Sequence, residues 1–303
     1  MARIVALTGA TGFIGGVLVR RLLESGVRLR ALSRSQARCA GGIEWVQGAL
    51  EDGDALARLV AGADTVIHCA GAVRGNSPEY FNRINVDGSR RLVEAARRSG
   101  SCERFLLMSS LAARHPDLSW YAASKLEAER QVKQAAGDIA VTVFRPTAVY
   151  GPGDREMRPL FEWLLRGWLF TLGQSNARLT LLHVEDLARA VLQWLMAPVA
   201  PSATYELNDC QRDGYDWRGI AAIAAEIRNA PVRQIVIPAP LLKALAQVNL
   251  SISYLTRRAP MLTPAKVCEL THPDWSCSND PIQAALGWEP RILLGRALQE
   301  HWF

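Results

Sequence analysis

Long apolar runs are missing from this sequence. No uninterrupted hydrophobic stretch approaches the roughly 20 residues that a helix needs to span a bilayer. The first residues, MARIVALTGATG, form a short apolar run that leads into glycines, which differs from the architecture of a signal peptide. We therefore expect a cytoplasmic protein, and peripheral contact with a membrane stays open as an addition.

Paired cysteines and clustered charge are also scarce. The six cysteines include no C-x-x-C pair, so we expect free thiols and neither a zinc site nor any other metal. The net charge is +6, yet the arginines are spread over many segments, and a nucleic-acid partner is therefore not expected. Charged residues make up 21% and hydrophobic residues 49%, which is typical of a folded globular protein.

Short β-branched runs alternate with helical patterns along the first half of the chain. This alternation predicts an α/β fold in which helices cover both faces of a parallel sheet. Beyond this half the regularity is lost, which indicates a smaller C-terminal lobe for the substrate. We predict a discontinuous division, with a cofactor domain over 1–150 and about 179–210, and a substrate lobe over 151–178 and 211–303.

A glycine-rich turn joins the first predicted strand to the first predicted helix. Gly9, Gly12 and Gly15 stand in the spacing G-x-x-G-x-x-G within GATGFIG. Glycines here let the backbone approach a pyrophosphate closely, and the helix presents free N–H groups and the positive end of its dipole. Placed between a strand and a helix, the motif predicts a Rossmann-type doubly wound domain that binds a dinucleotide.

The end of the second predicted strand indicates which dinucleotide is bound. An acidic residue there would bind the ribose hydroxyls and repel a 2′-phosphate. The strand LRALSR ends instead in Ser33 and Arg34, a hydroxyl and a guanidinium that suit a phosphate. We therefore predict NADP(H) rather than NAD(H); the alternative is that Arg34 is only a solvated strand end.

A tyrosine and a lysine stand four residues apart in the segment SWYAASKLEAER. Tyr121 and Lys125 are about one helical turn apart, so both project from the same face of the predicted helix. This spacing permits an acid–base pair, but it is also common by chance on helix surfaces. Other motifs have to decide between these two interpretations.

Such motifs occur in a fixed order: TGATGFIG, HCAG, NVDG, LLMSS, YAASK and FRPTAVYGPGD. Together they resemble the extended short-chain dehydrogenase/reductase family. The segments LLHVEDLARAV and NDPIQAALGWEPR extend the similarity almost to the C-terminus. The resemblance implies an NAD(P)-dependent enzyme.

The resemblance also implies a role for each candidate site residue. Tyr121 would be the general acid/base, and Lys125 would lower its pKa and bind the nicotinamide ribose. Ser110 would hydrogen-bond the reacting oxygen, with Ser109 as the alternative, and Asn85 would support the site. The implied cofactor-binding residues are Gly9, Thr11, Gly12, Phe13, Ile14, Gly15, Ser33, Arg34, Leu50, Ala70, Gly71, Lys125 and Pro146.

Two features depart from the pattern of the family. The family usually has an acidic residue for adenine after the third strand, where this chain has Gly48-Ala49-Leu50. Adenine would then contact the backbone of Leu50 and nearby apolar groups. The connection from Ser110 to Tyr121 is also short compared with sugar-nucleotide members, which implies a differently shaped mouth of the active site.

Three functions are open on this basis. The first is an oxidoreductase for a hydroxy or keto group of a bulky apolar substrate of sterol or isoprenoid type, resembling the 3β-hydroxysteroid dehydrogenase branch. The second is a nucleotide-sugar epimerase or dehydratase with a retained cofactor. The third is a non-catalytic cofactor-binding scaffold, which the Ser–Tyr–Lys set disfavours. Charged helices expected over 86–100 and 121–136 leave monomer and homodimer open.

Two apolar segments favour the first function. Residues 157–173 are predicted as one amphipathic helix with Trp163 on its apolar side, and residues 239–258 as another. Such helices most often pack the core of a lobe; the alternatives are an apolar substrate pocket or a surface resting on a membrane. Arg178 would meet a diphosphate in sugar-nucleotide members. The predicted substrate contacts are Ser110, Tyr121, Trp163 and Arg178.

Overall fold

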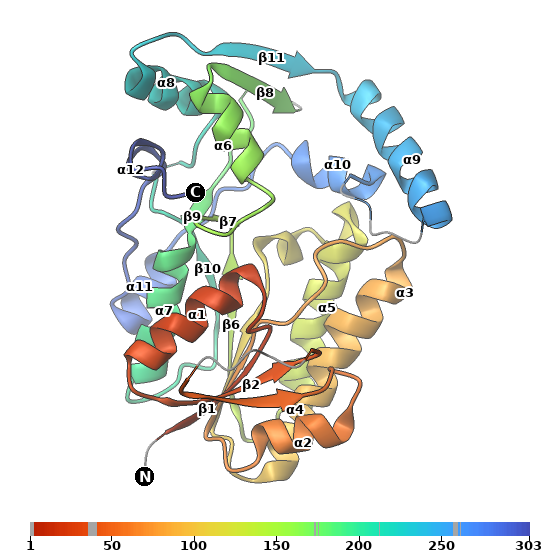
Figure 1. Ribbon diagram of the computed structural model, residues 1–303, viewed down its shortest axis with the longest axis vertical. Helices are drawn as coiled ribbons and strands as arrows, with labels where there is room; N and C mark the ends of the chain where they lie inside the picture. The colour runs from red at the N-terminus through yellow and green to blue at the C-terminus, as the bar shows by residue number, and fades with distance from the viewer. Residues whose placement is uncertain are drawn as a thin grey trace.

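A seven-stranded parallel sheet organises the lower lobe of the protein in Figure 1. This computed structural model describes residues 3–35, 41–172, 174, 176–211, 213–256, 260 and 262–303, so Cys39 and the ends of both predicted amphipathic segments lie outside the described residues. The strand order is β10-β6-β5-β4-β1-β2-β3, which confirms the predicted Rossmann-type fold. The strands are β1 (Ile4–Thr8), β2 (Arg28–Ser33), β3 (Ile43–Gln47), β4 (Thr65–His68), β5 (Arg104–Met108), β6 (Ala140–Pro146) and β10 (Thr204–Leu207).

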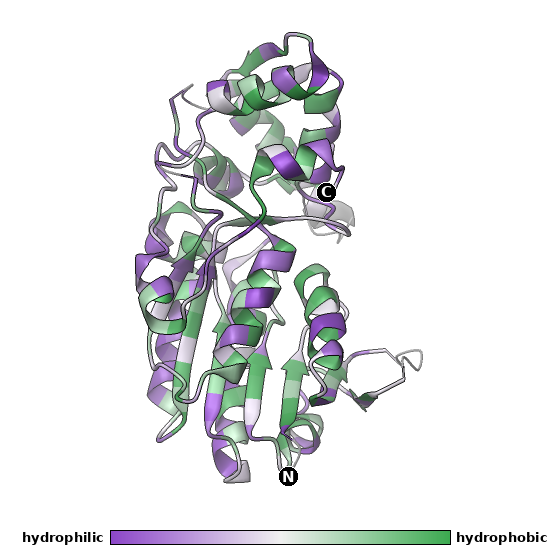
Figure 2. Cartoon of the chain, turned by 90° about the vertical axis from the view of Figure 1, so that its left-hand side faces the viewer, coloured by the Kyte–Doolittle hydropathy of each residue, from purple (hydrophilic) through white to green (hydrophobic). Residues whose placement is uncertain are grey.

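Helices cover both faces of this sheet. Apolar side chains of α1 and α7 form the core on one face, and those of α2, α4 and α5 form the core on the other. In Figure 2 the strands between them are mainly hydrophobic, as the parallel arrangement requires. The helical segments are α1 (Phe13–Glu24), α2 (Gly53–Val60), α3 (Pro78–Phe81), the π-helix η1 (Asn82–Asp87), α4 (Gly88–Ser99), the 3₁₀ turns η2 (Leu111–Arg114) and η3 (Pro116–Leu118), α5 (Trp120–Ala135) and α7 (Val184–Met196).

A C-terminal segment also packs against the sheet. Ile282 of α11 (Asp280–Leu286) and Trp288 lie in the same core as α1 and α7. The indole of Trp288 donates a hydrogen bond of 3.1 Å to the carbonyl of Asp186, whose carboxylate accepts two backbone N–H groups at 2.8 Å. The predicted division placed all of 211–303 in the substrate lobe, and this part of it lies against the sheet instead.

The second lobe stands above the carboxyl ends of the strands in Figure 1. It contains two small parallel pairs of strands, in which β7 pairs with β9 and β8 pairs with β11. None of the helices in the described part of the chain is long and apolar enough to cross a membrane. The remaining elements are β7 (Ala148–Tyr150), α6 (Arg158–Leu165), β8 (Trp168–Leu172), β9 (Leu181–His183), α8 (Trp217–Arg228), β11 (Arg233–Ile237), α9 (Ala239–Thr256), α10 (Pro264–Leu270) and α12 (Leu294–Gln299).

The single helix expected over 157–173 is wrong. Helix α6 ends at Leu165, and Gly167 then adopts a φ of +93°, in the left-handed region that favours glycine. The following residues form β8, whose backbone groups pair in parallel register with β11. This pairing partner is distant in sequence, and it outweighs the local helical pattern.

Candidate active site

The glycine-rich turn lines a cavity of about 280 Å³ at the carboxyl ends of β1, β2 and β4. Gly9 has a φ of +76°, and a Cβ there would lie 2.6 Å from the backbone nitrogen of Ala70. A Cβ on Gly15 would lie 2.0 Å from the carbonyl oxygen of Gly9. Both positions therefore require glycine. The predicted cofactor residues that line this cavity are Gly9, Thr11, Gly12, Ser33, Arg34, Leu50, Ala70 and Gly71.

The first turn of α1 is suited to a phosphate. Gly12 is the N-cap residue, no side chain caps the helix, and no acidic residue stands in the first turn. The N–H groups of Phe13 and Ile14 lie in this turn, where an α-helix leaves its N–H groups without intrahelical partners. The turn therefore offers donors and the positive end of the helix dipole to an anion.

The side of this cavity near the end of β2 carries a basic and an acidic residue. Ser33 is buried, and its hydroxyl donates a hydrogen bond of 2.9 Å to the carbonyl of Ser35, so Arg34 is left as the donor of the predicted pair. Arg34 is exposed and lines the cavity. Glu51, which was not predicted, also lines it and lies 4.0 Å from Arg83.

Tyr121 occupies the first turn of α5, where Ser119 is the N-cap and its hydroxyl accepts a hydrogen bond of 2.9 Å from Ala122. A hydrogen bond joins the phenol of Tyr121 to the hydroxyl of Ser110, and both residues line a second cavity. The alternative, Ser109, is buried and donates to Glu129 at 2.5 Å. The geometry therefore favours Ser110 for the position beside the reacting oxygen.

Lys125 lies one turn beyond Tyr121 and is buried between the sheet and η1. Its amine donates a hydrogen bond of 2.7 Å to the carbonyl of Met108. Burial lowers the pKa of Lys125 to about 8, while the neighbouring Cys69 and Glu129 act to raise it. The lysine is charged below this pKa and can serve as a donor to a ribose hydroxyl.

Asn85 connects η1 to α5. Its side-chain oxygen accepts a hydrogen bond of 2.7 Å from the backbone N–H of Ala72, and its amide donates to the carbonyl of Ala72 at 3.0 Å. The same amide donates to the hydroxyl of Ser124 at 2.9 Å. Asn85 thus ties the loop that follows β4 to α5, which agrees with a supporting role.

The pKa of Tyr121 is raised, whereas a lowered pKa was expected. Burial raises the pKa of Tyr121 to about 12; the hydrogen bond with Ser110 acts to lower this pKa, and the charge of Glu269 acts to raise it. A lowering of the Tyr121 pKa by Lys125 was expected and is not seen. The amine of Lys125 is directed at the carbonyl of Met108, and burial weakens its own charged state.

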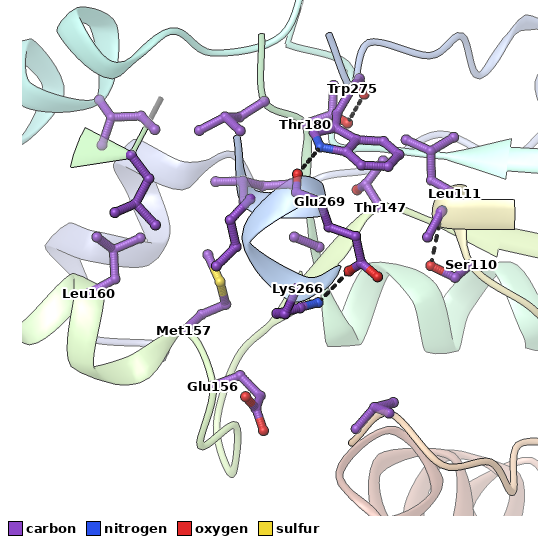
Figure 3. A pocket seen from close by; sticks show the side chains of 18 of the residues that line it. Ser110, Leu111, Thr147, Glu156, Met157, Leu160, Thr180, Lys266, Glu269 and Trp275 are labelled. Carbon is purple, nitrogen blue, oxygen red and sulfur yellow. Dashed lines mark hydrogen bonds and ion pairs between the residues drawn. The ribbon is translucent and has the colours of Figure 1, made fainter. Parts of the chain in front are cut away.

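The second cavity has a volume of about 470 Å³ and extends from Tyr121 into the upper lobe. Its walls are mainly apolar and come from both lobes (Figure 3). A volume of this size falls within the about 300–1,000 Å³ that is usual for small-molecule sites. Large apolar residues in the lining include Leu111, Met157, Phe161, Leu181, Trp217 and Leu270.

A polar pair on α10 interrupts this apolar lining. The amine of Lys266 donates to the carboxylate of Glu269 at 2.6 Å, and Figure 3 shows the two side chains directed at each other. Glu269 is buried and also accepts a hydrogen bond from the hydroxyl of Ser119. Lys266 lies 5.9 Å from the ring centroid of Tyr121, so the pair stands beside the phenol.

Two predicted substrate contacts lie outside this cavity and are corrected here. Trp163 is 44% exposed and packs edge-on against Phe170, with a centroid distance of 6.0 Å, because α6 turns this side chain away from the cavity. Arg178 is exposed, and its backbone pairs with the chain around Pro273 and Trp275 at 2.8 Å. Pro146, predicted to bind the cofactor, is buried at the end of β6 and lines neither cavity.

Sequence reasoning missed several residues of the site, among them Thr147, Lys266 and Glu269. Thr147 lines the second cavity, and its buried hydroxyl has no hydrogen-bond partner among the described residues, as expected for a group that binds a ligand. Its place directly after Pro146 in the motif FRPTAVYGPGD was the available signal. Lys266 and Glu269 lie far along the chain in no family motif, and the sequence offers no signal for them.

The N–H groups of the first turn of α1 and the glycine cradle fit a nicotinamide dinucleotide. The fold, together with Ser110, Tyr121 and Lys125, is that of an NAD-dependent enzyme of the short-chain dehydrogenase/reductase type. The chain belongs to the NAD dependent epimerase/dehydratase family, which it matches over residues 5–207. The expectation of an NAD(P)-dependent enzyme of the extended short-chain dehydrogenase/reductase family is thereby confirmed.

Curated relatives give the same assignment, and a solved structure shows the same fold. "Ceramide reductase" of Caulobacter vibrioides (strain NA1000 / CB15N) is 41% identical over 92% of this chain and 87% of that protein. "3 beta-hydroxysteroid dehydrogenase/Delta 5-->4-isomerase" of Mycobacterium tuberculosis (strain ATCC 25618 / H37Rv) is 28% identical over 98% of this chain and 88% of that protein. The structure "MoeE5 in complex with UDP-glucuronic acid and NAD" superposes with a TM-score of 0.74 at 23% identity, covering 98% of this chain and 96% of that one, and shows the likeness of fold.

Proposed function

We propose that this enzyme uses NADPH to reduce the ketone of a bulky apolar lipid of the ceramide class. The observation that carries this proposal is the apolar cavity of about 470 Å³ with the Tyr121 phenol in its lining. Burying an apolar ligand against such walls is worth about 25 cal/mol per Å² of apolar surface removed from water. Tails of a lipid would gain this energy, and a sugar diphosphate would not.

The charge of the cavity supports the same choice. Among the described residues that line it, Lys266 is the single cation, and Glu269 neutralises it at 2.6 Å. A nucleotide diphosphate needs several cationic or N–H donors to replace its hydration, as arginine clusters provide. Arg178, which would serve in an epimerase, is not part of the lining. An apolar substrate is therefore favoured over a nucleotide sugar.

The pair on α10 supports a ceramide-like lipid over a sterol. A ceramide carries an amide and hydroxyl groups close to its two long chains, whereas a sterol presents a single polar oxygen at its reacting end. Glu269 can accept a hydrogen bond from an amide N–H or a hydroxyl, and Lys266 can donate one to an amide carbonyl. The 41% identity to a protein named ceramide reductase points in the same direction.

The state of the catalytic groups suits reduction. The bound cofactor supplies the hydride. With its pKa raised to about 12, Tyr121 is protonated at neutral pH and can donate its proton to the carbonyl oxygen as that oxygen gains charge. Ser110 holds the same oxygen, and Lys125 orients the cofactor ribose. We also propose NADP(H) as the cofactor, because Arg34 is the exposed donor at the end of β2.

A substrate panel tests this function. We would follow NADPH consumption with an N-acylated long-chain amino ketone and with a sterol ketone, for the wild-type protein and for Tyr121→Phe. Binding of UDP-glucose would be measured by calorimetry, and its conversion by chromatography of the sugar nucleotides. Turnover of the amino ketone is expected, with a loss of about 10²–10⁴-fold in Tyr121→Phe. Binding or conversion of UDP-glucose without turnover of either lipid ketone would transfer the assignment to the epimerase alternative.

A further inference from the structure

The outer side of α9 is apolar. Leu242 and Ala246 are buried on the inner side of this helix, in a small core shared with α10. On the other side Leu241, Leu245 and Val248 stand at helical spacing and are 51%, 53% and 58% exposed. A surface helix of a globular protein usually turns polar residues to solvent, so an apolar outer side indicates a binding surface.

The neighbouring strand β11 extends this apolar surface. Val236 is also exposed, and β11 leads into α9 along the outer edge of the upper lobe (Figure 1). Side chains alternate along a strand, so Ile235 lies on the opposite face, together with Ile237, which packs against the core shared by α9 and α10. The exposed side chains of Val236, Leu241, Leu245 and Val248 are called the α9–β11 surface below. Scattered exposed apolar residues are ordinary in proteins, whereas a contiguous group of large ones marks an interaction site.

The segment that carries the α9–β11 surface has charge of one sign. Residues 227–265 contain five lysines and arginines and no aspartate or glutamate, and the next cation, Lys266, is paired with Glu269 at 2.6 Å. Apolar side chains combined with basic residues are typical of surfaces that bind anionic lipid bilayers.

We propose that the α9–β11 surface docks on a bilayer that contains anionic phospholipid, with α9 lying in the plane of the interface. Helix α9 packs on α10, and α10 contributes Lys266, Glu269 and Leu270 to the substrate cavity. Docking would therefore place this wall of the cavity beside the bilayer, which is where an apolar substrate resides. The charge argues against a second copy as the occupant, because a twofold contact would bring two segments of like charge, each with five lysines and arginines and no acidic residue, face to face.

Flotation with vesicles tests this proposal without substrate or cofactor, so its failure would leave the proposed reaction untouched. The vesicles are phosphatidylcholine alone or an equimolar mixture of phosphatidylcholine and phosphatidylglycerol. The wild-type protein is expected to bind the mixed vesicles, and to bind less as salt is raised. Combining Leu245→Glu with Val248→Glu should weaken this binding by more than about twentyfold, since each unfavourable charge costs about fivefold.

Two further variants keep the test decisive. Lys243→Glu on α9 should weaken binding to the mixed vesicles, and Val199→Glu, which alters an exposed valine outside the α9–β11 surface, should not. The NADPH dissociation constant reports whether each variant is folded. Three results would overturn the proposal: no binding of wild type to the mixed vesicles, unchanged binding in the double variant, or a wild-type dimer in sedimentation that the double variant abolishes.

Discussion

The raised pKa of Tyr121 should make the two directions of the reaction respond differently to pH. Reduction of a ketone needs a protonated phenol, whereas oxidation of the alcohol needs the tyrosinate as a base. Burial raises the pKa of Tyr121 to about 12, so the phenol is protonated throughout the neutral range. We expect reduction to be insensitive to the titration of Tyr121 there, and oxidation to accelerate as the pH rises.

The magnitude follows from the distance between this pKa and the assay pH. About five pH units separate neutral pH from a pKa of about 12, so roughly one phenol in 10⁵ is ionised, a cost of about 7 kcal/mol. The ionised fraction grows tenfold for each pH unit. Between about pH 6 and 7.5, below the pKa of about 8 for Lys125, kcat/KM for oxidation should therefore rise about tenfold per pH unit.

The assay follows NADPH consumption with the ketone and NADP⁺ reduction with the alcohol over this pH range. Ser110→Ala removes the hydrogen bond that acts to lower the pKa of Tyr121, so oxidation should become slower still at any given pH. Tyr205→Phe, which alters a buried tyrosine in the sheet core, should keep the wild-type slope. A flat pH profile for oxidation, or the same slope in Tyr121→Phe, would refute this account of the acid–base group.

Three other changes test the cofactor and substrate sites. In calorimetry, Arg34→Ala should weaken NADPH binding by roughly ten- to a hundredfold and leave NADH binding unchanged. Arg28→Ala, which alters an exposed arginine, is the control. An equal loss of affinity for both cofactors would contradict NADP(H) selectivity. Lys125 loses its charge as the pH rises through its pKa of about 8, so cofactor affinity should fall across that pH. The variant Lys125→Met should bind the cofactor weakly at every pH. If its cofactor affinity still fell near pH 8, Lys125 would be excluded as the cause. Glu269→Gln removes a charge that raises the pKa of Tyr121, so it should speed oxidation at fixed pH while raising KM for the amino ketone. Glu156→Gln, at the same cavity, is the matched control, and an unchanged rate of oxidation in Glu269→Gln would count against the contact with Tyr121.

The contrast between α5 and β8 shows which features could be predicted. The Tyr121–Lys125 spacing was interpreted as one helical turn, and α5 has that form, because spacing along a helix is a local property. Residues 168–172 have an apolar pattern compatible with a helix, yet they pair with β11, more than sixty residues later in the chain. A short apolar segment adopts the conformation that its tertiary partner imposes, and no local pattern reveals that partner.

Within the candidate site, local and tertiary information divide in the same way. The sequence alone determined the phosphate cradle and the one-turn spacing of Tyr121 and Lys125, because turn glycines and helical spacing act over a few residues. Ser110 was a candidate through the family resemblance, with Ser109 as the alternative. Only the tertiary structure decided that α10 brings Lys266 and Glu269 beside Tyr121 and that Trp163 faces away from the cavity. These contacts join residues that are distant along the chain, and burial and charge in a shared cavity arise only once both lobes are packed together.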